Sequence, residues 1–310
     1  MSFKILGIGS CLPGDPISNE ALSKIVDTND EWIKTRTGIL QRYFTTRTLS
    51  SLAHEASLEA IKDAKIDKSE IDLILVCSTT PDRAFPSTAA TIQGLLGLKN
   101  IPSMDLNAVC SGFLYGLHIS KALFNTYSYK KILLIGADKM SSVLDMKERS
   151  TAVLFGDGAG AVILEKDENN FFDSEIGADG TYSEILKTEI SAEKEEKIYM
   201  QGGEVYKQAV TKMHELSRLM ISRNSLSTKD IDFLVLHQAN IRIIEAVAEK
   251  LGIDKSKTIT TVKHHANTSA ATIPLALHNM KEKNMLKRGN LILMSAVGAG
   301  LTSAGAIIRY

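Results

Sequence analysis

The chain has 310 residues, a mass of 33.8 kDa and 44% apolar residues, which is enough for one large α/β unit or two packed halves. Lys plus Arg and Asp plus Glu number 36 each, so the net charge of +0 gives no global reason to expect binding to nucleic acid or to a membrane. The three cysteines stand far apart without a C-x-x-C pair, which argues against a disulfide framework and structural zinc and favours a reducing cytoplasm.

The N-terminal segment, M-S-F-K-I-L-G-I-G-S-C, has an apolar run too short for a signal peptide, and no later stretch has the length of a transmembrane helix. We therefore expect a cytoplasmic protein. Next in the chain, Trp32 and Arg36 are spaced i, i+4 and so share one face of a predicted helix. Two interpretations stay open for Trp32, the only tryptophan: a ring that stacks on an adenine, and an ordinary core residue.

Helical patterns then alternate with short continuous apolar runs. Helices are expected over residues 52–65 and 205–224, and each precedes an apolar strand. Strands that are apolar throughout are typical of sheets buried on both faces. The pattern therefore predicts an α/β fold with helices between and outside the sheets.

Cys110 follows an extended run over residues 104–109 and precedes an amphipathic segment that reaches about Asn125. A thiol at a helix N-terminus lies beside unpaired N–H groups and the positive end of the helix dipole, which stabilise the thiolate. We therefore predict a lowered pKa and a nucleophilic role for Cys110. Cys11 and Cys77 are expected to be small buried apolar residues.

A glycine-rich stretch follows at F-G-D-G-A-G-A, residues 155–161, and resembles a phosphate-binding loop. The next residues, A-V-I-L-E, predict a strand and not a helix whose N-terminus would hold phosphate. We prefer a glycine-kinked turn that lets the backbone approach another chain segment. The charged stretch Glu189–Lys197 is expected to be a solvated loop between two halves of the chain.

Two polar residues in the last third stand where a strand or loop meets a helix. His237 ends the apolar strand in I-D-F-L-V-L-H-Q-A-N, and Asn267 lies in H-H-A-N-T-S-A-A just before a helix. Active-site residues of α/β proteins gather at such places. His264 and His265 precede Asn267, but no further ligand has suitable spacing, so we expect no metal site.

An internal repeat connects these residues. The run K-S-E-I-D-L-I-L-V-C-S-T-T, residues 68–80, matches residues 228–240 at an offset of 160, and residues 131–137 match residues 290–296 at 159. The repeat predicts two similar halves, residues 1–165 and 166–310. It would align Cys110 with Asn267 and Cys77 with His237, so that Cys110, His237 and Asn267 meet where the halves join.

Several motifs then occur in one order along the whole chain: D-E-W-I-K-T-R-T-G-I, A-F-P-S, A-V-C-S-G-F, F-G-D-G-A-G-A, A-D-G, H-Q-A-N-x-R-I-I and N-T-S-A-A. With them the chain resembles the β-ketoacyl-acyl carrier protein synthase III family. The resemblance implies the thiolase fold, with two duplicated halves packed in layers around mixed five-stranded sheets, and a homodimer. It also implies decarboxylative condensation of an acyl-coenzyme A with malonyl-acyl carrier protein through an acyl-cysteine, which initiates fatty acid synthesis.

Carried over to matching positions, the resemblance assigns residues to roles. Cys110 would be the acylated nucleophile, while His237 and Asn267 would bind the malonyl thioester carbonyl and stabilise the enolate. The backbone N–H groups of Cys110 and Ala299 would form the oxyanion hole. The other implied sites are Trp32, Arg36 and Arg149 for the coenzyme A nucleotide, Phe85, Phe155, Val297 and Leu301 for the acyl pocket (Phe85 entering the partner subunit's), and Arg242 and Lys207 for the carrier protein. No metal and no permanently bound cofactor are implied, because acyl-coenzyme A is a substrate.

The C-terminal loop departs from the family pattern. It reads V-G-A-G-L-T-S-A-G where the family usually has F-G-G-G-F-T-W-G, and Ala266 stands where the family has glycine before Asn267. If position 299 requires a positive φ, alanine there costs about 1 kcal/mol. Because Val297 and Leu301 replace phenylalanines, we expect a longer or branched acyl donor in place of acetyl.

Three other functions stay open. An acyltransferase or specialised condensing enzyme of secondary metabolism would use the same scaffold. A papain-like protease also has Cys, His and Asn in this order, but the signature C-G-S-C-W is absent. A non-catalytic binding protein is disfavoured by the intact set of Cys110, His237 and Asn267. Asn267 favours condensation, because its amide donates a hydrogen bond that an ionised aspartate could not donate.

Overall fold

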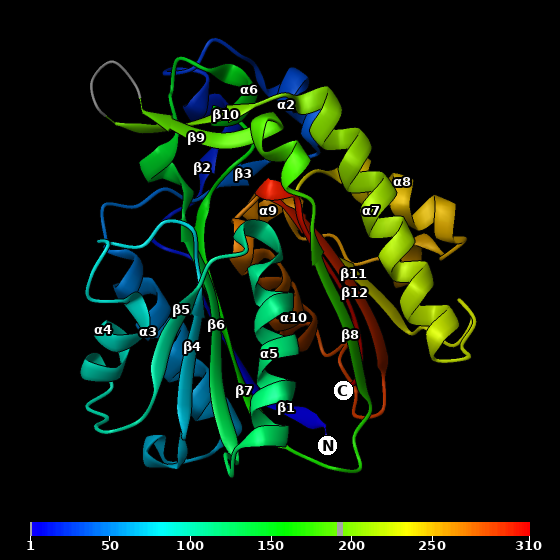
Figure 1. Cartoon of the computed structure of the whole chain (residues 1–310). Coiled ribbons are helices and arrows are strands. Elements are labelled where there is room, and N and C mark those ends of the chain that lie inside the picture. Colours follow the sequence, from blue (N-terminus) through cyan, green and yellow to red (C-terminus); the bar gives the residue numbers. More distant parts are fainter. Residues whose placement is uncertain (1, 191–194) are drawn as a thin grey trace.

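Two sheets stand side by side, with helices between them and on both outer faces, in the computed structural model, which describes residues 2–190 and 195–310 (Figure 1). The first sheet has the strand order β1-β7-β6-β4-β5, in which β6, β4 and β5 pair in parallel and β7 pairs antiparallel with both β1 and β6. Its strands are β1 (Phe3–Cys11), β4 (Leu73–Cys77), β5 (Ser103–Leu106), β6 (Lys131–Lys139) and β7 (Asp157–Lys166).

The second sheet repeats this topology in the order β11-β12-β13-β8. Its strands are β8 (Phe172–Ala178), β11 (Phe233–Leu236), β12 (Leu291–Gly298) and β13 (Thr302–Arg309). Among the described residues it has four strands, so the expectation of five in both sheets is wrong for this one. At the place of the fifth strand, Thr258 forms a single isolated parallel bridge with Leu234, which is too short to count as a strand.

The register confirms the internal repeat. In the first half Leu73 of β4 pairs with Ile132 of β6, and in the second half Phe233 of β11 pairs with Ile292 of β12, each 160 residues later. The expected helix 52–65 is α3 (Leu49–Ala64), and the helix expected at 205–224 is α7 (Gly202–Arg223). α3 begins early because the Thr48 side chain accepts the N–H of Ser51 as an N-cap.

One equivalence drawn from the sequence is wrong. The helices α5 (Gly112–Thr126) and α10 (Thr272–Glu282) start 160 residues apart, and each follows a 3-10 turn, η2 (Val109–Ser111) or η6 (Ser269–Ala271). The same offset aligns Cys110 with Ala270 and Asn107 with Asn267. The predicted offset of 157 missed this, because the sequences of these two turns differ.

Five layers result from the packing of these helices (Figure 1). The helices α3 and α4 (Thr88–Leu95) cover the outer face of the first sheet, and α7 and α8 (Ile241–Leu251) cover that of the second. The helices α5 and α10 fill the space between the sheets and share one apolar core with both. Two packed α/β halves were predicted, and this arrangement agrees with them.

The glycines of the expected kinked turn serve close packing. Gly158 and Gly160 lie in β7, and a Cβ on Gly160 would come within 2.7 Å of the Cβ of Pro274 at the start of α10. The expected turn is therefore wrong, because these glycines lie within the strand itself, whereas the expected close approach of two chain segments is confirmed.

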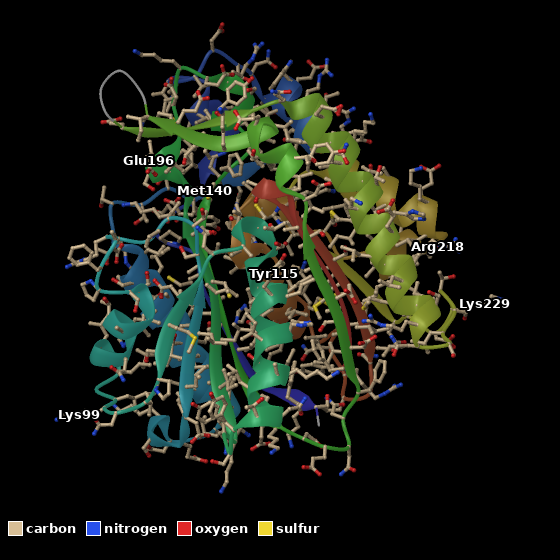
Figure 2. All side chains as sticks on the ribbon, in the orientation of Figure 1. Lys99, Tyr115, Met140, Glu196, Arg218 and Lys229 are labelled. Carbon is tan, nitrogen blue, oxygen red and sulfur yellow. The ribbon has the colours of Figure 1, made fainter. Side chains whose placement is uncertain are left out.

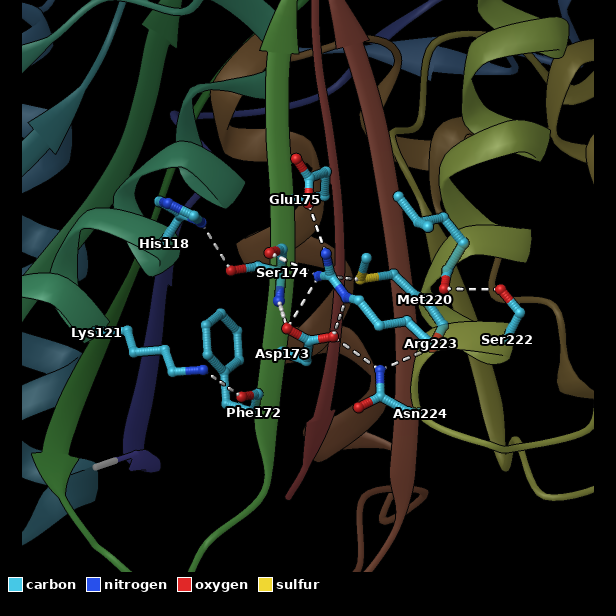
Figure 3. A network of polar contacts seen from close by, with 11 residues as sticks. His118, Lys121, Phe172, Asp173, Ser174, Glu175, Met220, Ser222, Arg223 and Asn224 are labelled. Atoms are coloured by element: carbon cyan, nitrogen blue, oxygen red, sulfur yellow. Dashed lines mark hydrogen bonds and ion pairs between the residues drawn. The ribbon is translucent and has the colours of Figure 1, made fainter.

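Hydrogen bonds and ion pairs hold the C-terminal end of α7 against β8 (Figure 3). Arg223 donates from Nε and Nη2 to the carboxylate of Asp173, at 2.8 and 2.9 Å, and from Nη1 to Glu175 at 2.6 Å. On the other side of β8, Nδ1 of His118 in α5 lies 2.9 Å from the hydroxyl of Ser174. The strand β8 therefore links a central helix to an outer one.

Short elements gather at one end of the molecule, at the top of Figure 1. They are β2 (Ile17–Ser18), β3 (Gln41–Arg42), α2 (Asp30–Thr37), α6 (Arg149–Ala152), β9 (Leu186–Ile190) and β10 (Glu196–Met200), while α1 (Asn19–Leu22) and α9 (Val262–His265) complete the helices. The charged stretch 189–197, expected to be a loop, contributes to the hairpin of β9 and β10, and residues 191–194 lie outside the described residues. In the part of the chain that is described, no helix combines the length and apolarity needed to cross a bilayer.

Candidate active site

Cys110 lies on the turn η2, at the junction of the two halves. Val109 adopts a φ of 48°, which turns the chain sharply after β5 and before α5. The end of β12 packs against this turn, and a Cβ on Gly298 would lie 2.8 Å from the backbone nitrogen of Cys110. Because residue 298 is glycine, the N–H of Cys110 stays accessible, and it has no acceptor among the described residues.

One cavity of about 320 Å³ contains the three predicted reactive side chains. Its lining includes Cys110, His237 and Asn267, which come from η2, from the residue after β11 and from the loop before η6. Apolar atoms dominate the remaining walls, supplied by the neighbouring strands and by α7; they include Phe155, Ala209, Met213, Val297 and Leu301. The predicted meeting of Cys110, His237 and Asn267 is confirmed, although their roles stay predictions.

A second cavity of about 180 Å³ adjoins the first at Cys110. Cys110, Phe155 and Leu186 line both cavities. The other residues of the smaller cavity come from β9, β10 and the segments after β4 and β6: Thr79, Thr80, Met140, Val143, Lys187, Thr188 and Ile198, together with Val109 and Ala299. Met140 lies beneath the hairpin of β9 and β10 (Figure 2).

His237 is buried and neutral. Burial lowers the pKa of its imidazole to about 3, so the ring carries no charge at physiological pH. Nδ1 lies 2.7 Å from the hydroxyl of Thr272, which also lies 3.0 Å from the carbonyl oxygen of Ser269. The contact to Thr272 occupies Nδ1 and leaves Nε2 as the nitrogen that remains for a substrate.

Asn267 has a fixed orientation. Its Oδ1 accepts the backbone N–H of Ser269 at 2.9 Å, which only an oxygen can do, so Nδ2 is the atom left to donate into the cavity. The preceding Ala266 has φ 56° and ψ −160°, a conformation that is otherwise adopted almost only by glycine. The loop thus holds the amide rigidly at the cost of backbone strain.

The predicted lowering of the thiol pKa is wrong. Burial raises the pKa of Cys110 to about 12, and the nearby charge of Asp138 acts in the same direction, while the hydroxyl of Ser269 opposes it. Cys110 lies on η2, before α5 begins, and desolvation is the largest influence on its pKa.

Ala299 and its neighbours differ from the sequence expectation in one respect. The positive φ of this loop falls on Gly300, at 126°, and not on Ala299, so the alanine carries no conformational penalty. Val297 and Leu301 line the larger cavity, Ala299 lines the smaller one, and Phe155 lines both. The assignment of Phe155, Val297 and Leu301 to the acyl pocket stays a prediction.

Trp32 and two arginines gather near the protein surface. The Arg149 guanidinium lies 4.6 Å from the centre of the Trp32 ring, and Trp32 and Arg36 border a shallow pocket on α2. Arg149 also donates to the carbonyl oxygen of Asp27 at 3.3 Å. The structure thus brings together the three residues predicted to hold a nucleotide.

The remaining predicted residues lie around the larger cavity and on the surface. Arg242 lines that cavity, with its guanidinium 5.3 Å from the centre of the Tyr206 ring. Lys207 follows Tyr206 on α7 and is exposed, and its Nζ lies 3.8 Å from a carboxylate oxygen of Glu204. Phe85 is 84% exposed on the single chain and lines none of these cavities. Among the described residues, no three or more His, Cys, Asp or Glu side chains are arranged to hold a metal.

Sequence reasoning missed three buried polar residues near the site: Asp138 and Ser269, which influence the pKa of Cys110, and Thr272, which contacts His237. Asp138 ends the apolar run of β6 just as His237 follows that of β11, so the same rule would have found it. No comparable pattern marks Ser269 or Thr272, whose hydroxyls resemble those of any helix start.

Comparisons with known proteins agree with this geometry. A family model described as 3-oxoacyl-[acyl-carrier-protein] synthase III matches residues 104–180, and one described as the C terminal part of the same synthase matches residues 221–310. The β-ketoacyl-[acyl-carrier-protein] synthase III of Rickettsia prowazekii is 50% identical over 100% of both chains.

Solved structures are similar over the whole chain as well. The 3-oxoacyl-[acyl-carrier-protein] synthase III of Aquifex aeolicus is 41% identical, with a TM-score of 0.95 and 100% of both chains covered. The priming β-ketosynthase of the R1128 polyketide pathway is 30% identical, with a TM-score of 0.95, and the match covers 99% of this chain and 96% of the other. The two-half fold predicted above is thus shown by these structures.

Proposed function

Because the chain belongs to the 3-oxoacyl-[acyl-carrier-protein] synthase III family, we propose that Cys110, His237 and Asn267 perform the two half-reactions of that enzyme. The chain is an acyl-transferring condensing enzyme: it condenses an acyl-coenzyme A with malonyl-acyl carrier protein and so initiates fatty acid synthesis. The observation that carries the residue assignment is that a single cavity contains all three side chains.

In the first half-reaction the Cys110 sulfur attacks the carbonyl carbon of the acyl thioester, and coenzyme A leaves. The accessible N–H of Cys110, with the N–H of Ala299, binds the oxygen that becomes negative. Preorganised donors of this kind stabilise the transition state, and losing one typically slows a reaction by about a hundredfold or more. Gly298 supports this assignment, since it leaves the approach to the Cys110 N–H open.

In the second half-reaction the malonyl thioester carbonyl accepts hydrogen bonds from Nε2 of His237 and Nδ2 of Asn267. Both nitrogens are the ones left free by the contacts to Thr272 and Ser269. As carbon dioxide leaves, these donors stabilise the enolate, whose carbon then attacks the acyl group on Cys110. The low pKa of His237 keeps it a neutral donor throughout.

The acyl chain occupies the smaller cavity in this proposal, with coenzyme A or the carrier arm in the larger one. A volume of about 180 Å³ corresponds to about six water molecules, whereas acetyl has one methyl group beyond its carbonyl. This room supports a donor longer than acetyl or branched. Trp32, Arg36 and Arg149 are proposed to hold the nucleotide, since a guanidinium and an indole face each other there.

Arg242 and Lys207 are proposed to meet the acidic carrier protein, because Arg242 borders the larger cavity and Lys207 is exposed on the adjacent α7. A homodimer is proposed as well. Phe85 is exposed on this chain, as a residue that fills a partner's pocket would be, and β5 pairs with a neighbour on only one side among the described strands.

The proposal also divides the chain at residues 1–165 and 166–310 and places it in the cytoplasm. The division is supported by the sheets, since the strands of one come from residues 3–166 and those of the other from residues 172–309. Widely spaced, unpaired cysteines support a reducing compartment.

Intact-protein mass spectrometry tests the assignment. The protein is mixed with a panel of straight and branched acyl-coenzyme A donors, and then malonyl-acyl carrier protein is added while released carbon dioxide is measured. We expect an acyl adduct on Cys110 that forms faster with chains longer than acetyl or with branched chains. Addition of the carrier protein should discharge it. A strict preference for acetyl would contradict the proposed donor.

Two variants separate the half-reactions. Cys110→Ser should form no adduct under the same conditions. Asn267→Asp should still become acylated, but discharge should slow by about a hundredfold, because an ionised carboxylate repels the enolate and donates no hydrogen bond. Equal discharge rates in Asn267→Asp and the unchanged protein would refute the role of Asn267.

A condensing role in secondary metabolism is the second candidate, favoured by the 30% identity to the priming β-ketosynthase. The two candidates differ in the carrier protein. Discharge is therefore compared with a fatty acid carrier protein and with a polyketide carrier protein, and the former should react faster, in line with the 50% identity to the fatty acid enzyme.

A further inference from the structure

Arg42 is a buried cation to which the two half-reactions assign no role. It lies on β3 with 0% exposure and is by volume the largest fully buried side chain of the described residues. Burial lowers the pKa of its guanidinium to about 10, so the group stays charged at physiological pH. Its hydrogen bonds go to neutral oxygens only. Burying a cation in this way costs free energy unless its partners compensate, so those partners indicate its role.

On one side, the guanidinium is connected to both ends of α2 through Asn19. Its Nη1 donates to Oδ1 of Asn19 at 2.7 Å. Nδ2 of Asn19 donates to Oδ1 of Asp30, the first residue of α2, and to the carbonyl oxygen of Ile39, two residues beyond its end, both at 2.9 Å. Asn19 is 1% exposed, so these bonds are shielded from water. Arg42 thus fixes the position of the helix that carries Trp32.

On the other side, the same guanidinium is connected to α6. Its Nη2 donates at 3.2 Å to the carbonyl oxygen of Val153, the residue directly after α6. The N–H of Val153 donates to the carbonyl oxygen of Arg149, one turn earlier, at 3.4 Å. Nη1 also donates to the carbonyl oxygen of Ile17 in β2 at 3.4 Å. One planar group therefore joins α2, α6 and β2, which lie together at the top of Figure 1.

The helices α2 and α6 carry the side chains that are proposed to hold the nucleotide. Trp32 is half-buried and Arg149 is exposed, with its guanidinium 4.6 Å from the centre of the Trp32 ring. With four residues, α6 is too short to be stable without support from its surroundings. The relative position of the two side chains therefore depends on the connection that Arg42 makes beneath them.

We propose that Arg42 is a positioning residue for the coenzyme A nucleotide: it holds α2 and α6 at the spacing at which their side chains bind it. Those side chains are Trp32 and Arg36 on α2 and Arg149 on α6. A guanidinium suits this role because its planar fork donates in several directions at once, whereas the compact ammonium of lysine cannot span both acceptors. The inference rests on the proposed nucleotide site.

A kinetic consequence distinguishes this role from a general structural one. Arg42 lines neither of the two cavities at Cys110, so it acts on the nucleotide and not on the reacting atoms. Loss of binding that is equal in the ground state and the transition state raises KM and leaves kcat unchanged. A thioester without a nucleotide should not be affected at all.

The variant Arg42→Lys of the full-length protein tests the proposal. Acylation of Cys110 is measured against the concentration of butyryl-coenzyme A and of butyryl-pantetheine, which has the same thioester and arm but no nucleotide. We expect KM for butyryl-coenzyme A to rise about tenfold at unchanged kcat, and KM for butyryl-pantetheine to stay the same. An equal change with both donors would overturn the proposal.

Two variants of Asp30 test the same connection with Arg42 left intact. Asp30→Ala removes an acceptor of Asn19 and should raise KM for butyryl-coenzyme A alone. Asp30→Asn provides an acceptor again, without the charge that pairs with Lys34, and should restore the KM of the unchanged protein. If Arg42→Lys does not fold, equal KM values for the two Asp30 variants overturn the proposal.

Binding of coenzyme A itself gives a measurement that does not depend on activity. Trp32 is the only tryptophan of the chain, so its fluorescence reports this binding. The Kd should rise in Arg42→Lys in proportion to KM, and an unchanged Kd would overturn the proposal. Arg223→Lys is the matched control, because Arg223 also holds a helix in place, at β8, and here the Kd should not change.

A variant of the nucleotide site separates failure of this inference from failure of the proposed function. Trp32→Ala should raise KM for butyryl-coenzyme A and leave KM for butyryl-pantetheine unchanged. If Trp32→Ala has this effect and Arg42→Lys does not, Arg42 has no positioning role. If Trp32→Ala leaves both values unchanged, the proposed nucleotide site is itself contradicted, and the inference with it.

Discussion

Ala266 adopts a strained backbone conformation that positions the neighbouring Asn267. Its φ of 56° and ψ of −160° lie in a region that alanine avoids, and it is fully buried directly before Asn267. The N–H of Asn267 donates to the carbonyl oxygen of Leu154, and Phe155 forms a bridge with Asn267. These contacts hold the strained loop in place.

Ala266→Gly should therefore stabilise the protein. Relief of the strain should outweigh the greater flexibility of the unfolded chain and raise the free energy of unfolding by about 1 kcal/mol. Urea denaturation measures it. As a control, Ala276→Gly within α10 should lower stability by about 1 kcal/mol, because glycine weakens a regular helix. Destabilisation by both changes would contradict the strain at Ala266.

At the residue scale, the identity of the site residues could be predicted from the sequence, but their environment could not. Cys110, His237 and Asn267 were recognisable because each ends or begins an element in a pattern visible along the chain. The pKa of Cys110 was not, since it depends on burial by β12 and η6, which only the packed halves bring to it.

At the scale of elements, the spacing between β6 and η6 controls where Asn267 sits. Gly136 of β6 lies directly under the carbonyl of Ala270, and an added Cβ would collide with that oxygen. The alternation of helices and buried strands followed from the apolar runs, but the order of the strands within each sheet was not predicted. Their contact distance did not, because it is set by single glycines whose neighbours come from the other half.

Gly136→Ala should thus damage both stability and chemistry. Pushing η6 away typically costs about 1–3 kcal/mol and moves Asn267, so discharge of the acyl-enzyme should slow more than its formation. Denaturation and the two half-reaction rates are measured. Gly94→Ala in α4 is the matched control: a Cβ there meets nothing within 4 Å, and the change should stabilise the helix by about 0.5–1 kcal/mol.

At the scale of the whole molecule, the buried His237 and the partly buried His265 make the fold sensitive to acid. Burial lowers the pKa of His237 to about 3 and of His265 to about 4, whereas both titrate near 6.5 in the unfolded chain. As the pH falls below 6.5, the two histidines bind protons in the unfolded chain but not in the folded chain. The free energy of unfolding therefore decreases as the pH falls below 6.5. The raised pKa values of the buried Asp138 and Asp157 have the opposite effect on stability.

Chemical denaturation at pH 7 and pH 5 should show this loss. Each histidine contributes about 1.4 kcal/mol per pH unit once the pH is well below 6.5. His265→Gln should remove about half of the difference between the two pH values, because it leaves only His237 to protonate on unfolding. If the variant and the unchanged protein lose the same free energy of unfolding between pH 7 and pH 5, groups other than His265 cause the sensitivity to acid.

The proposed placement of the two thioesters has a kinetic consequence. If the acyl chain occupies the smaller cavity, the pantetheine arms of both thioesters enter through the larger one, so coenzyme A must leave before the malonyl carrier binds. Turnover of this kind is ping-pong, and parallel lines in a double-reciprocal plot are its signature. Excess malonyl-acyl carrier protein then inhibits the reaction by binding to the enzyme before it is acylated.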